Sequence, residues 1–126
     1  MKKRILIIED NEKNRMLEKD LFETAGFEVL EAPDGASGIA LAQKEKPDAI
    51  VLDIRLPGMP GPHVAKILRQ EPGTRDIPII FVTASLVGEW MGELRAIPNT
   101  MFLPKPFDTR TFVEEVSRFI QGGSHE

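Results

Sequence analysis

The segment Ala49–Asp53, with the sequence AIVLD, consists of the apolar run Ala49–Leu52 and a carboxylate that follows it directly. An uninterrupted apolar run with β-branched residues is typical of a strand that is covered on both faces of a parallel sheet. Two more runs of this kind occur at Ile5–Ile8 and Ile79–Val82, and weaker ones lie at Phe27–Leu30 and Met101–Leu103. The sequence therefore predicts five strands, three of them central.

Stretches with a helical spacing of apolar residues separate these runs. The first of them carries Leu17, Leu21 and Ala25 at intervals of four, and we expect this face to pack on the sheet. The later faces are Val64, Ile67 and Leu68, and then Phe112, Val113, Val116, Phe119 and Ile120. Five strands, each followed by a helix, require right-handed crossovers and a parallel sheet with helices on both faces. The predicted fold is a doubly wound α/β domain.

Polar residues stand where the predicted strands end. Glu9 and Asp10 follow the first run, Asp53 ends the third, Thr83 the fourth, and Lys105 follows the fifth. In the flavodoxin-like strand order 2-1-3-4-5, the first and third strands flank the point where the order reverses, and ligands bind beyond the strand ends at that point. We therefore expect the five side chains to meet in one crevice, to which the second strand, on the edge, contributes nothing.

Three clustered carboxylates indicate a cation. Two like charges about 4 Å apart repel by roughly 4 kcal/mol at an effective dielectric near 20, so Glu9, Asp10 and Asp53 need a neutralising partner. Mg²⁺ prefers oxygen ligands and commonly binds carboxylates together with phosphate oxygens, and Mn²⁺ is the alternative. The chain has no cysteine and only two histidines, so a zinc or copper site lacks a ligand set.

With a cation in place, a strand-end aspartate can act as a nucleophile toward a phosphoryl group. Asp53 would form an aspartyl phosphate, while Lys105 offers a point charge and Thr83 a hydrogen bond to the phosphoryl oxygens. Ala84 is small enough to leave an entry path. Taken singly, Asp53 could be a helix cap and Lys105 a solvated lysine; the coincidence of five suitable residues at strand ends favours a phosphoryl site.

Bulk composition is that of one soluble domain. The chain has 126 residues, 41% of them apolar and 29% charged, and we expect residues 1–121 to fold and 122–126 to form a disordered tail. A net charge of −4 disfavours direct DNA binding, which usually needs a basic surface. The apolar start is too short for a signal peptide or a membrane span, and no disulfide can form, so we expect a cytoplasmic protein.

These motifs resemble the receiver domain of two-component response regulators over essentially the whole chain. The matching residues are Ile8–Asn11 at the first strand end, Asp53, Leu56, Pro57 and Gly61 around the acceptor, Thr83 with Ala84, and Lys105–Phe107. The resemblance implies that Asp53 is phosphorylated by a histidine kinase or a histidine phosphotransfer protein. It implies a signalling phosphoacceptor and not an enzyme, with only slow self-catalysed phosphotransfer and dephosphorylation.

The resemblance also implies finer roles at this site. Mg²⁺ would be held by Glu9, Asp10, Asp53 and the backbone carbonyl of Arg55, directly or through water. Lys105 would contact the phosphoryl group, aimed by a cis bond between Lys105 and Pro106.

A conformational switch is a further implication of the resemblance. Phosphorylation would draw Thr83 inward and let Phe102 rotate into the vacated space, although a static core role for Phe102 is the alternative. The weak helix expected near residues 87–96 carries Trp90, which is either a partner contact or a packing residue. Together with the fifth strand and the last helix, this helix would form the face that binds a downstream protein. The protein itself would be a monomer or a phosphorylation-dependent dimer.

Three alternatives stay open at this point. The chain is read as a stand-alone receiver, but an excised domain of a longer regulator has the same sequence features. An Mg²⁺-dependent aspartyl phosphatase of the haloacid dehalogenase type also uses a strand-end aspartate, yet it needs a second aspartate where Arg55 stands. A flavin carrier shares the fold, but the acidic Glu9 and Asp10 would repel the flavin phosphate.

Overall fold

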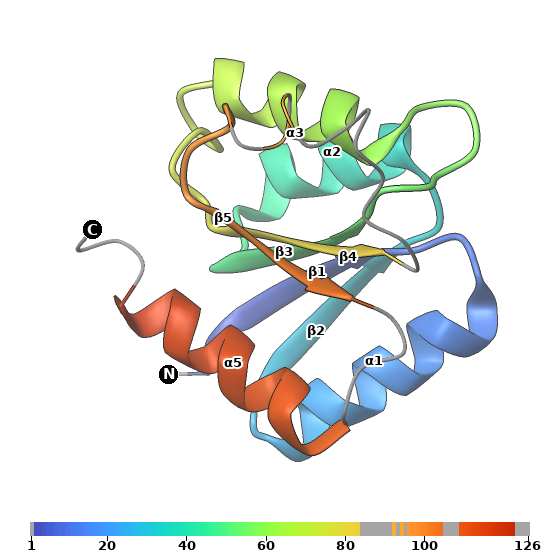
Figure 1. Ribbon diagram of the computed structural model, residues 1–126, viewed down its shortest axis with the longest axis vertical. Coiled ribbons are helices and arrows are strands. Elements are labelled where there is room, and N and C mark those ends of the chain that lie inside the picture. The colour runs from blue at the N-terminus through green and yellow to red at the C-terminus, as the bar shows by residue number, and fades with distance from the viewer. Residues whose placement is uncertain (1, 84–91, 93, 95, 105–108, 123–126) are drawn as a thin grey trace.

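A five-stranded parallel sheet in the order β2-β1-β3-β4-β5 forms the centre of the protein, as predicted. The computed structural model describes residues 2–83, 92, 94, 96–104 and 109–122 (Figure 1). The strands are β1 (Arg4–Ile8), β2 (Glu28–Ala32), β3 (Ala49–Asp53), β4 (Ile79–Thr83) and β5 (Thr100–Pro104). The helices are α1 (Glu12–Thr24), α2 (Gly35–Glu45), α3 (Gly61–Gln70) and α5 (Thr109–Gly122).

Several predictions concern residues outside this description. Of the helix expected near 87–96, residues 87–91, 93 and 95 are not described, and Trp90 is among them. Ala84, Lys105, Pro106 and most of the predicted tail are not described either.

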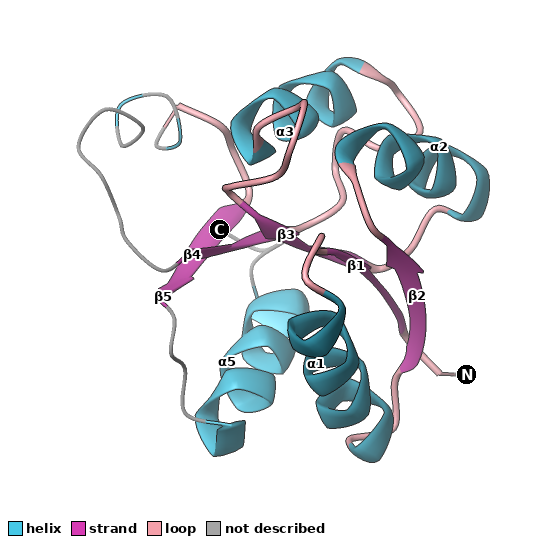
Figure 2. Ribbon diagram, turned by 90° about the vertical axis from the view of Figure 1, so that its right-hand side faces the viewer, coloured by secondary structure: helices cyan, strands magenta, loops and turns pink. Residues whose placement is uncertain are grey.

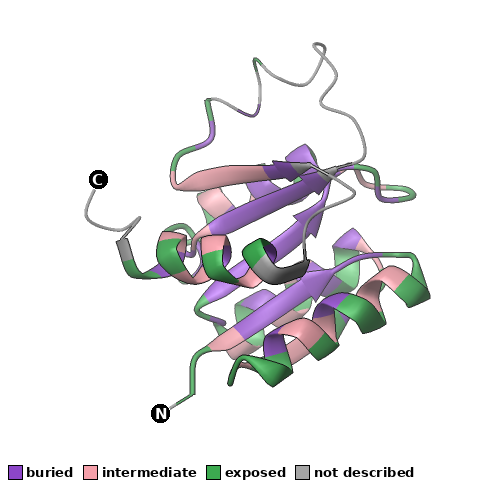
Figure 3. Ribbon diagram, turned by 60° about the horizontal axis from the view of Figure 1, so that its bottom comes forward, coloured by how far each residue is buried: buried purple, intermediate pink, exposed green. Residues whose placement is uncertain are grey.

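The helices form one layer on each face of the sheet, with α1 and α5 on one side and α2 and α3 on the other (Figures 1 and 2). Alternate strand residues serve two cores. Leu6, Ile50 and Phe81 pack with α2 and α3, while Ile7 and Val51 point to the opposite face and pack with α1 and α5. Both faces of the central strands are covered, which explains why their sequences are continuously apolar (Figure 3).

The side of α1 that faces the sheet differs in part from the predicted one. Leu21 is half-buried and packs against the core, as predicted. Leu17 is 44% exposed and Ala25 is exposed, whereas Phe22 and Glu18 are buried. The ring of Phe22 lies 5.3 Å from that of Phe112 in α5 and 5.6 Å from that of Phe27. A buried aromatic side chain contributes more apolar area than a leucine, so α1 is turned to bury Phe22.

The inner faces of α3 and α5 match their predictions. Val64 and Leu68 of α3, and Phe112, Val116 and Ile120 of α5, are buried in the two cores. The other members of the predicted faces, Ile67, Val113 and Phe119, are partly buried.

Side-chain caps start the first two helices. The Asn11 side chain accepts a hydrogen bond of 2.9 Å from the amide of Asn14, and Asp34 accepts one of 2.8 Å from the amide of Ser37. The hydrogen bonds from Ser37 lower the pKa of the Asp34 carboxyl. Among the described residues, no helix is long and apolar enough to cross a bilayer.

Candidate functional site

Three acidic side chains meet at the carboxyl end of β1 and β3. One carboxylate oxygen from each of Glu9, Asp10 and Asp53 lies within 4.8 Å of the others. Glu9 and Asp10 directly follow β1, and Asp53 is the last residue of β3. The two strands are neighbours, with Ile8 paired to Leu52, so the parallel register itself brings the three groups together. We call Glu9, Asp10 and Asp53 the acidic cluster.

Burial makes the acidic cluster electrostatically costly. Glu9 is 2% exposed and Asp53 is 8% exposed, while Asp10 faces solvent. At separations below 5 Å, each pair of ionised groups repels by roughly 3 kcal/mol at an effective dielectric near 20. A bound cation would remove this repulsion. All three donors are carboxylate oxygens, so the donor set fits a hard cation such as Mg²⁺ or Mn²⁺.

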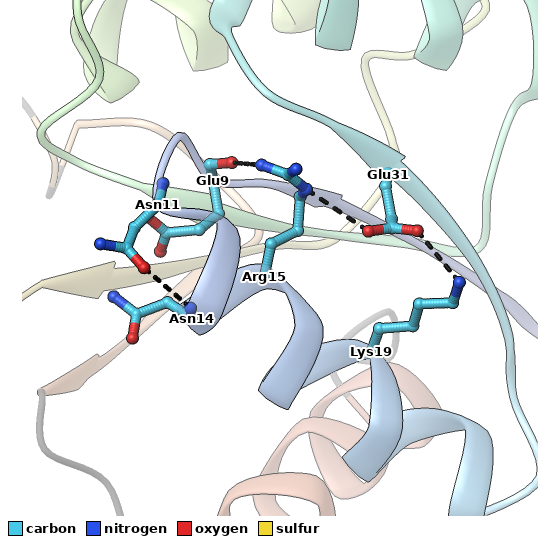
Figure 4. Close-up of polar contacts among 6 residues, drawn as sticks. All are labelled: Glu9, Asn11, Asn14, Arg15, Lys19 and Glu31. Atoms are coloured by element: carbon cyan, nitrogen blue, oxygen red, sulfur yellow. Dashed lines mark hydrogen bonds and ion pairs between the residues drawn. The ribbon is translucent and has the colours of Figure 1, made fainter.

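Glu9 makes hydrogen bonds through its amide, its carbonyl and its carboxylate. Its amide donates to the carbonyl of Ala32 in β2 over 3.1 Å, and its carboxylate accepts from the amide of Asn11 over 3.1 Å. Its carbonyl accepts from Nη1 of Arg15 over 2.8 Å (Figure 4). Asn11 also caps α1, so the turn that carries Glu9 and Asp10 is continuous with a capped helix.

Asp53 is oriented by the turn that follows β3. Its Oδ1 accepts a hydrogen bond of 3.0 Å from the amide of Arg55. The next residue, Ile54, donates to the carbonyl of Val82 in β4 and accepts from the amide of Gly61 over 2.8 Å. The chain between Asp53 and α3 is therefore held at both ends. The role of the Arg55 carbonyl as a metal ligand stays a prediction.

Gly61 is needed because α3 begins against the backbone of Asp53. A Cβ atom at Gly61 would lie 2.6 Å from the carbonyl oxygen of Asp53 and 2.8 Å from Cα of Ile54. Both are backbone atoms that cannot turn aside as a flexible side chain would. The absence of a side chain at this position lets β3 and α3 approach each other closely.

We expect Gly61→Ala to lower the free energy of unfolding by about 3 kcal/mol, the upper part of the usual range for overpacking, because backbone must move. Chemical denaturation measures this change. Gly73→Ala is the matched control, since a Cβ there would meet the flexible end of the Lys46 side chain, and it should cost far less. Equal losses in the two variants would contradict the close approach at Gly61.

Thr83 lies at the same edge of the sheet as the acidic cluster. It is the last residue of β4, and the residue before it, Val82, is paired with Asp53. The end of β4 therefore lies at the predicted edge of the sheet. The hydroxyl contact of Thr83, the Ala84 entry path, the Lys105 ammonium and the cis bond before Pro106 stay predictions, because these groups are outside the description.

Phe102 lies in β5 and is half-buried. Its ring stacks on that of Phe81 in β4, with centroids 5.6 Å apart and planes 16° apart. It packs at the edge of the core beneath α2 and α3. This partly exposed position is compatible with the predicted switch and with the static alternative, so the switch stays a prediction.

Sequence reasoning missed two charged residues beside the acidic cluster. Arg15 of α1 reaches the Glu9 carbonyl, and it also pairs with Glu31 of β2. The edge strand β2 therefore takes part in building the site through Glu31 and the Ala32 carbonyl, contrary to the expectation that it contributes nothing. The only signal in the sequence was Glu31, a charged residue near the end of the predicted edge strand. The spacing of apolar residues does not indicate which partner such a charge has.

Comparison with known proteins agrees with this geometry. Residues 5–117 match the family of response regulator receiver domains. The polar-differentiation response regulator DivK of Brucella anthropi is 33% identical over 120 residues, which cover 95% of this chain and 98% of DivK.

Solved structures share the fold. The chemotaxis protein CheY4 of Vibrio cholerae has a TM-score of 0.88 and 29% identity, covering 94% of this chain and 99% of that one. The receiver domain of sensor histidine kinase PA1611 from Pseudomonas aeruginosa has a TM-score of 0.87 and 26% identity, covering 96% and 99%. That crystal structure has a magnesium ion coordinated in its active site cleft.

Proposed function

Because the chain belongs to the family of response regulator receiver domains, we propose that its Asp53 accepts a phosphoryl group in a two-component or phosphorelay system. The observation that carries the proposal is the acidic cluster, which joins a nearly buried Asp53 to two more carboxylates at the carboxyl edge of the sheet. Such a site can bind a cation and present one carboxylate to a phosphoryl donor.

The proposed reaction is a transfer between two residues. A carboxylate oxygen of Asp53 attacks the phosphorus of a phosphohistidine on a histidine kinase or a histidine phosphotransfer protein. The new O–P bond forms as the P–N bond breaks, and the bonding electrons return to the imidazole nitrogen. The hydrogen bond from the Arg55 amide to Oδ1 of Asp53 orients the carboxylate for this attack. Lys105 and Thr83 would contact the phosphoryl oxygens.

A divalent cation fits the donor set of the acidic cluster. Glu9, Asp10, Asp53 and the backbone carbonyl of Arg55 would hold Mg²⁺, with Mn²⁺ as the alternative. When bound, the cation supplies positive charge that offsets the charge on the carboxylates and on the phosphoryl oxygens. The magnesium ion in the PA1611 receiver domain, a structural relative at 26% identity, supports this assignment.

The output of the proposed switch is a protein contact. Phosphorylation would shift Thr83 and Phe102 and change the face formed by the helix expected near residues 87–96, β5 and α5. This face would then bind a downstream protein. The stacking of Phe102 on Phe81 offers a packing that such a shift could exchange for another. The runner-up function, an aspartyl phosphatase, is disfavoured because Arg55 stands where a general acid would be needed.

The test of this proposal is phosphorylation of the whole chain by a small acyl phosphate. With Mg²⁺ present, the intact mass should rise by one phosphoryl group. Removal of the metal with a chelator should slow the reaction by at least about tenfold, because repulsion at the acidic cluster is then unrelieved. No mass increase with Mg²⁺, or the same rate without it, would contradict the proposed function.

A further inference from the structure

We propose that Arg15 is a positioning residue for the divalent cation, and that Glu31 holds its guanidinium on the backbone of Glu9. This inference rests on the proposed function of the acidic cluster. It concerns two residues that contribute no ligand to the cation themselves.

The guanidinium of Arg15 makes two contacts at once. Its Nη1 donates to the carbonyl oxygen of Glu9 over 2.8 Å, and its Nε lies 3.3 Å from Oε1 of Glu31 (Figure 4). The side chain is only 18% exposed. A planar guanidinium with fixed donor directions can hold both partners in one geometry. Arg15 therefore connects α1, the end of β2 and the turn after β1.

The Glu9 carbonyl is the group whose position matters for the cation. It belongs to the peptide unit between Glu9 and Asp10, so its orientation is linked to the directions of both side chains. The Glu9 amide is already tied to Ala32, and the Glu9 carboxylate to Asn11. With Arg15 on the carbonyl, the peptide between the two ligands cannot rotate freely. Loss of Arg15 would release it, and the two carboxylates would need to be ordered when the cation binds.

Glu31 gives the guanidinium a counter-charge outside the acidic cluster. A cationic side chain beside a cation site would otherwise compete for the same carboxylates. The Glu31 carboxylate pairs with Arg15 through one oxygen and with Nζ of Lys19 through the other, over 3.2 Å (Figure 4). Glu31 thus keeps Arg15 directed at a neutral carbonyl oxygen.

The sign of the effect on cation affinity separates positioning from simple electrostatics. Removing a positive charge near the acidic cluster should strengthen cation binding by Coulomb's law. Removing a positioning group should weaken it. Lys19 is the matched control, because it carries the same charge, pairs with the same Glu31 and lies one helical turn farther along α1. Its hydrogen bond to Glu31 raises the pKa of Lys19, so it is charged at neutral pH.

The experiment measures Mn²⁺ affinity from the electron paramagnetic resonance signal of free Mn²⁺, using the whole chain. We expect Arg15→Ala to bind Mn²⁺ about tenfold more weakly than wild type, the lower end of the range for residues that orient metal ligands. Lys19→Ala should bind equally or up to about twofold more tightly. Arg15→Lys should recover part of the loss, because an ammonium group can still donate to the Glu9 carbonyl.

A second variant covers the case in which Arg15→Ala does not fold. Glu31→Gln should weaken Mn²⁺ binding several-fold in the wild-type background. The same change should have a smaller effect in the Arg15→Lys background, where the contact that Glu31 holds is already weakened. Loss of charge alone would weaken binding equally in both backgrounds, and that result would overturn the inference. Affinities of Arg15→Ala and Lys19→Ala that change in the same direction and to the same extent would overturn the inference. A wild-type protein that binds no Mn²⁺ would instead overturn the proposed function.

Discussion

The Asp53→Asn variant is expected to gain no phosphoryl group from an acyl phosphate under conditions in which wild type gains one. An amide oxygen is a poor nucleophile toward phosphorus, while the side chain keeps nearly the same size in its 8% exposed position. The variant can also still accept the hydrogen bond that the Arg55 amide donates to Oδ1. The fold should therefore persist while the reaction is lost, and intact-mass measurement detects the difference.

Asp48→Asn is the matched control for this variant. Asp48 directly precedes β3, at the end of the strand opposite Asp53, and its carboxylate accepts a hydrogen bond of 2.7 Å from the amide of Arg4. The same chemical change at that end of the strand should leave phosphorylation at the wild-type rate. Phosphorylation of Asp53→Asn at that rate would refute the assignment of the acceptor.

Asp10→Asn is expected to change metal affinity and stability in opposite directions. Asp10 is the exposed member of the acidic cluster, and losing its charge should weaken Mg²⁺ binding by about 100-fold, equivalent to about 2.7 kcal/mol. Without metal, the same substitution removes repulsion toward Glu9 and Asp53. Solvent screens an exposed charge, so the expected gain in the free energy of unfolding is only about 1 kcal/mol.

Chemical denaturation with and without Mg²⁺ measures both effects. At a concentration 100 times its dissociation constant, Mg²⁺ should stabilise wild type by about 2.7 kcal/mol, and at that concentration it should stabilise Asp10→Asn by less than about 0.5 kcal/mol. In the presence of a chelator, Asp10→Asn should be the more stable of the two proteins. A variant that is less stable without metal, or equally stabilised by Mg²⁺, would show that Asp10 does not share a cation with its neighbours.

The sheet and its functional edge follow from local sequence features. The runs at Ile5–Ile8, Ala49–Leu52 and Ile79–Val82 became the buried central strands because both faces of each strand are covered. A parallel register then aligns the strand ends, so residues 44 positions apart in β1 and β3, and 29 positions apart in β3 and β4, meet in space. This is why Glu9, Asp10 and Asp53 could be expected to converge from the sequence alone.

Contacts between side chains that are distant in the sequence could not be predicted from local patterns. The intervals of four in α1 favour a face with Leu17, but the three-ring contact around Phe22 depends on Phe112, which is far away in sequence. The ion pair between Arg15 and Glu31 likewise joins a helix to an edge strand. Neither partner is marked by a local pattern, because a single charge on a helix or at a strand end is usually solvated.

The position of the phosphoryl group on the phosphorylated wild-type chain tests the central claim most directly. Fragmentation of the protein by mass spectrometry, at an acidic pH that preserves acyl phosphates, should place the group on Asp53. It should be lost on mild alkaline treatment, as expected of a mixed anhydride. A phosphoryl group on His63, on a serine or threonine hydroxyl, or on any other carboxylate would contradict the account.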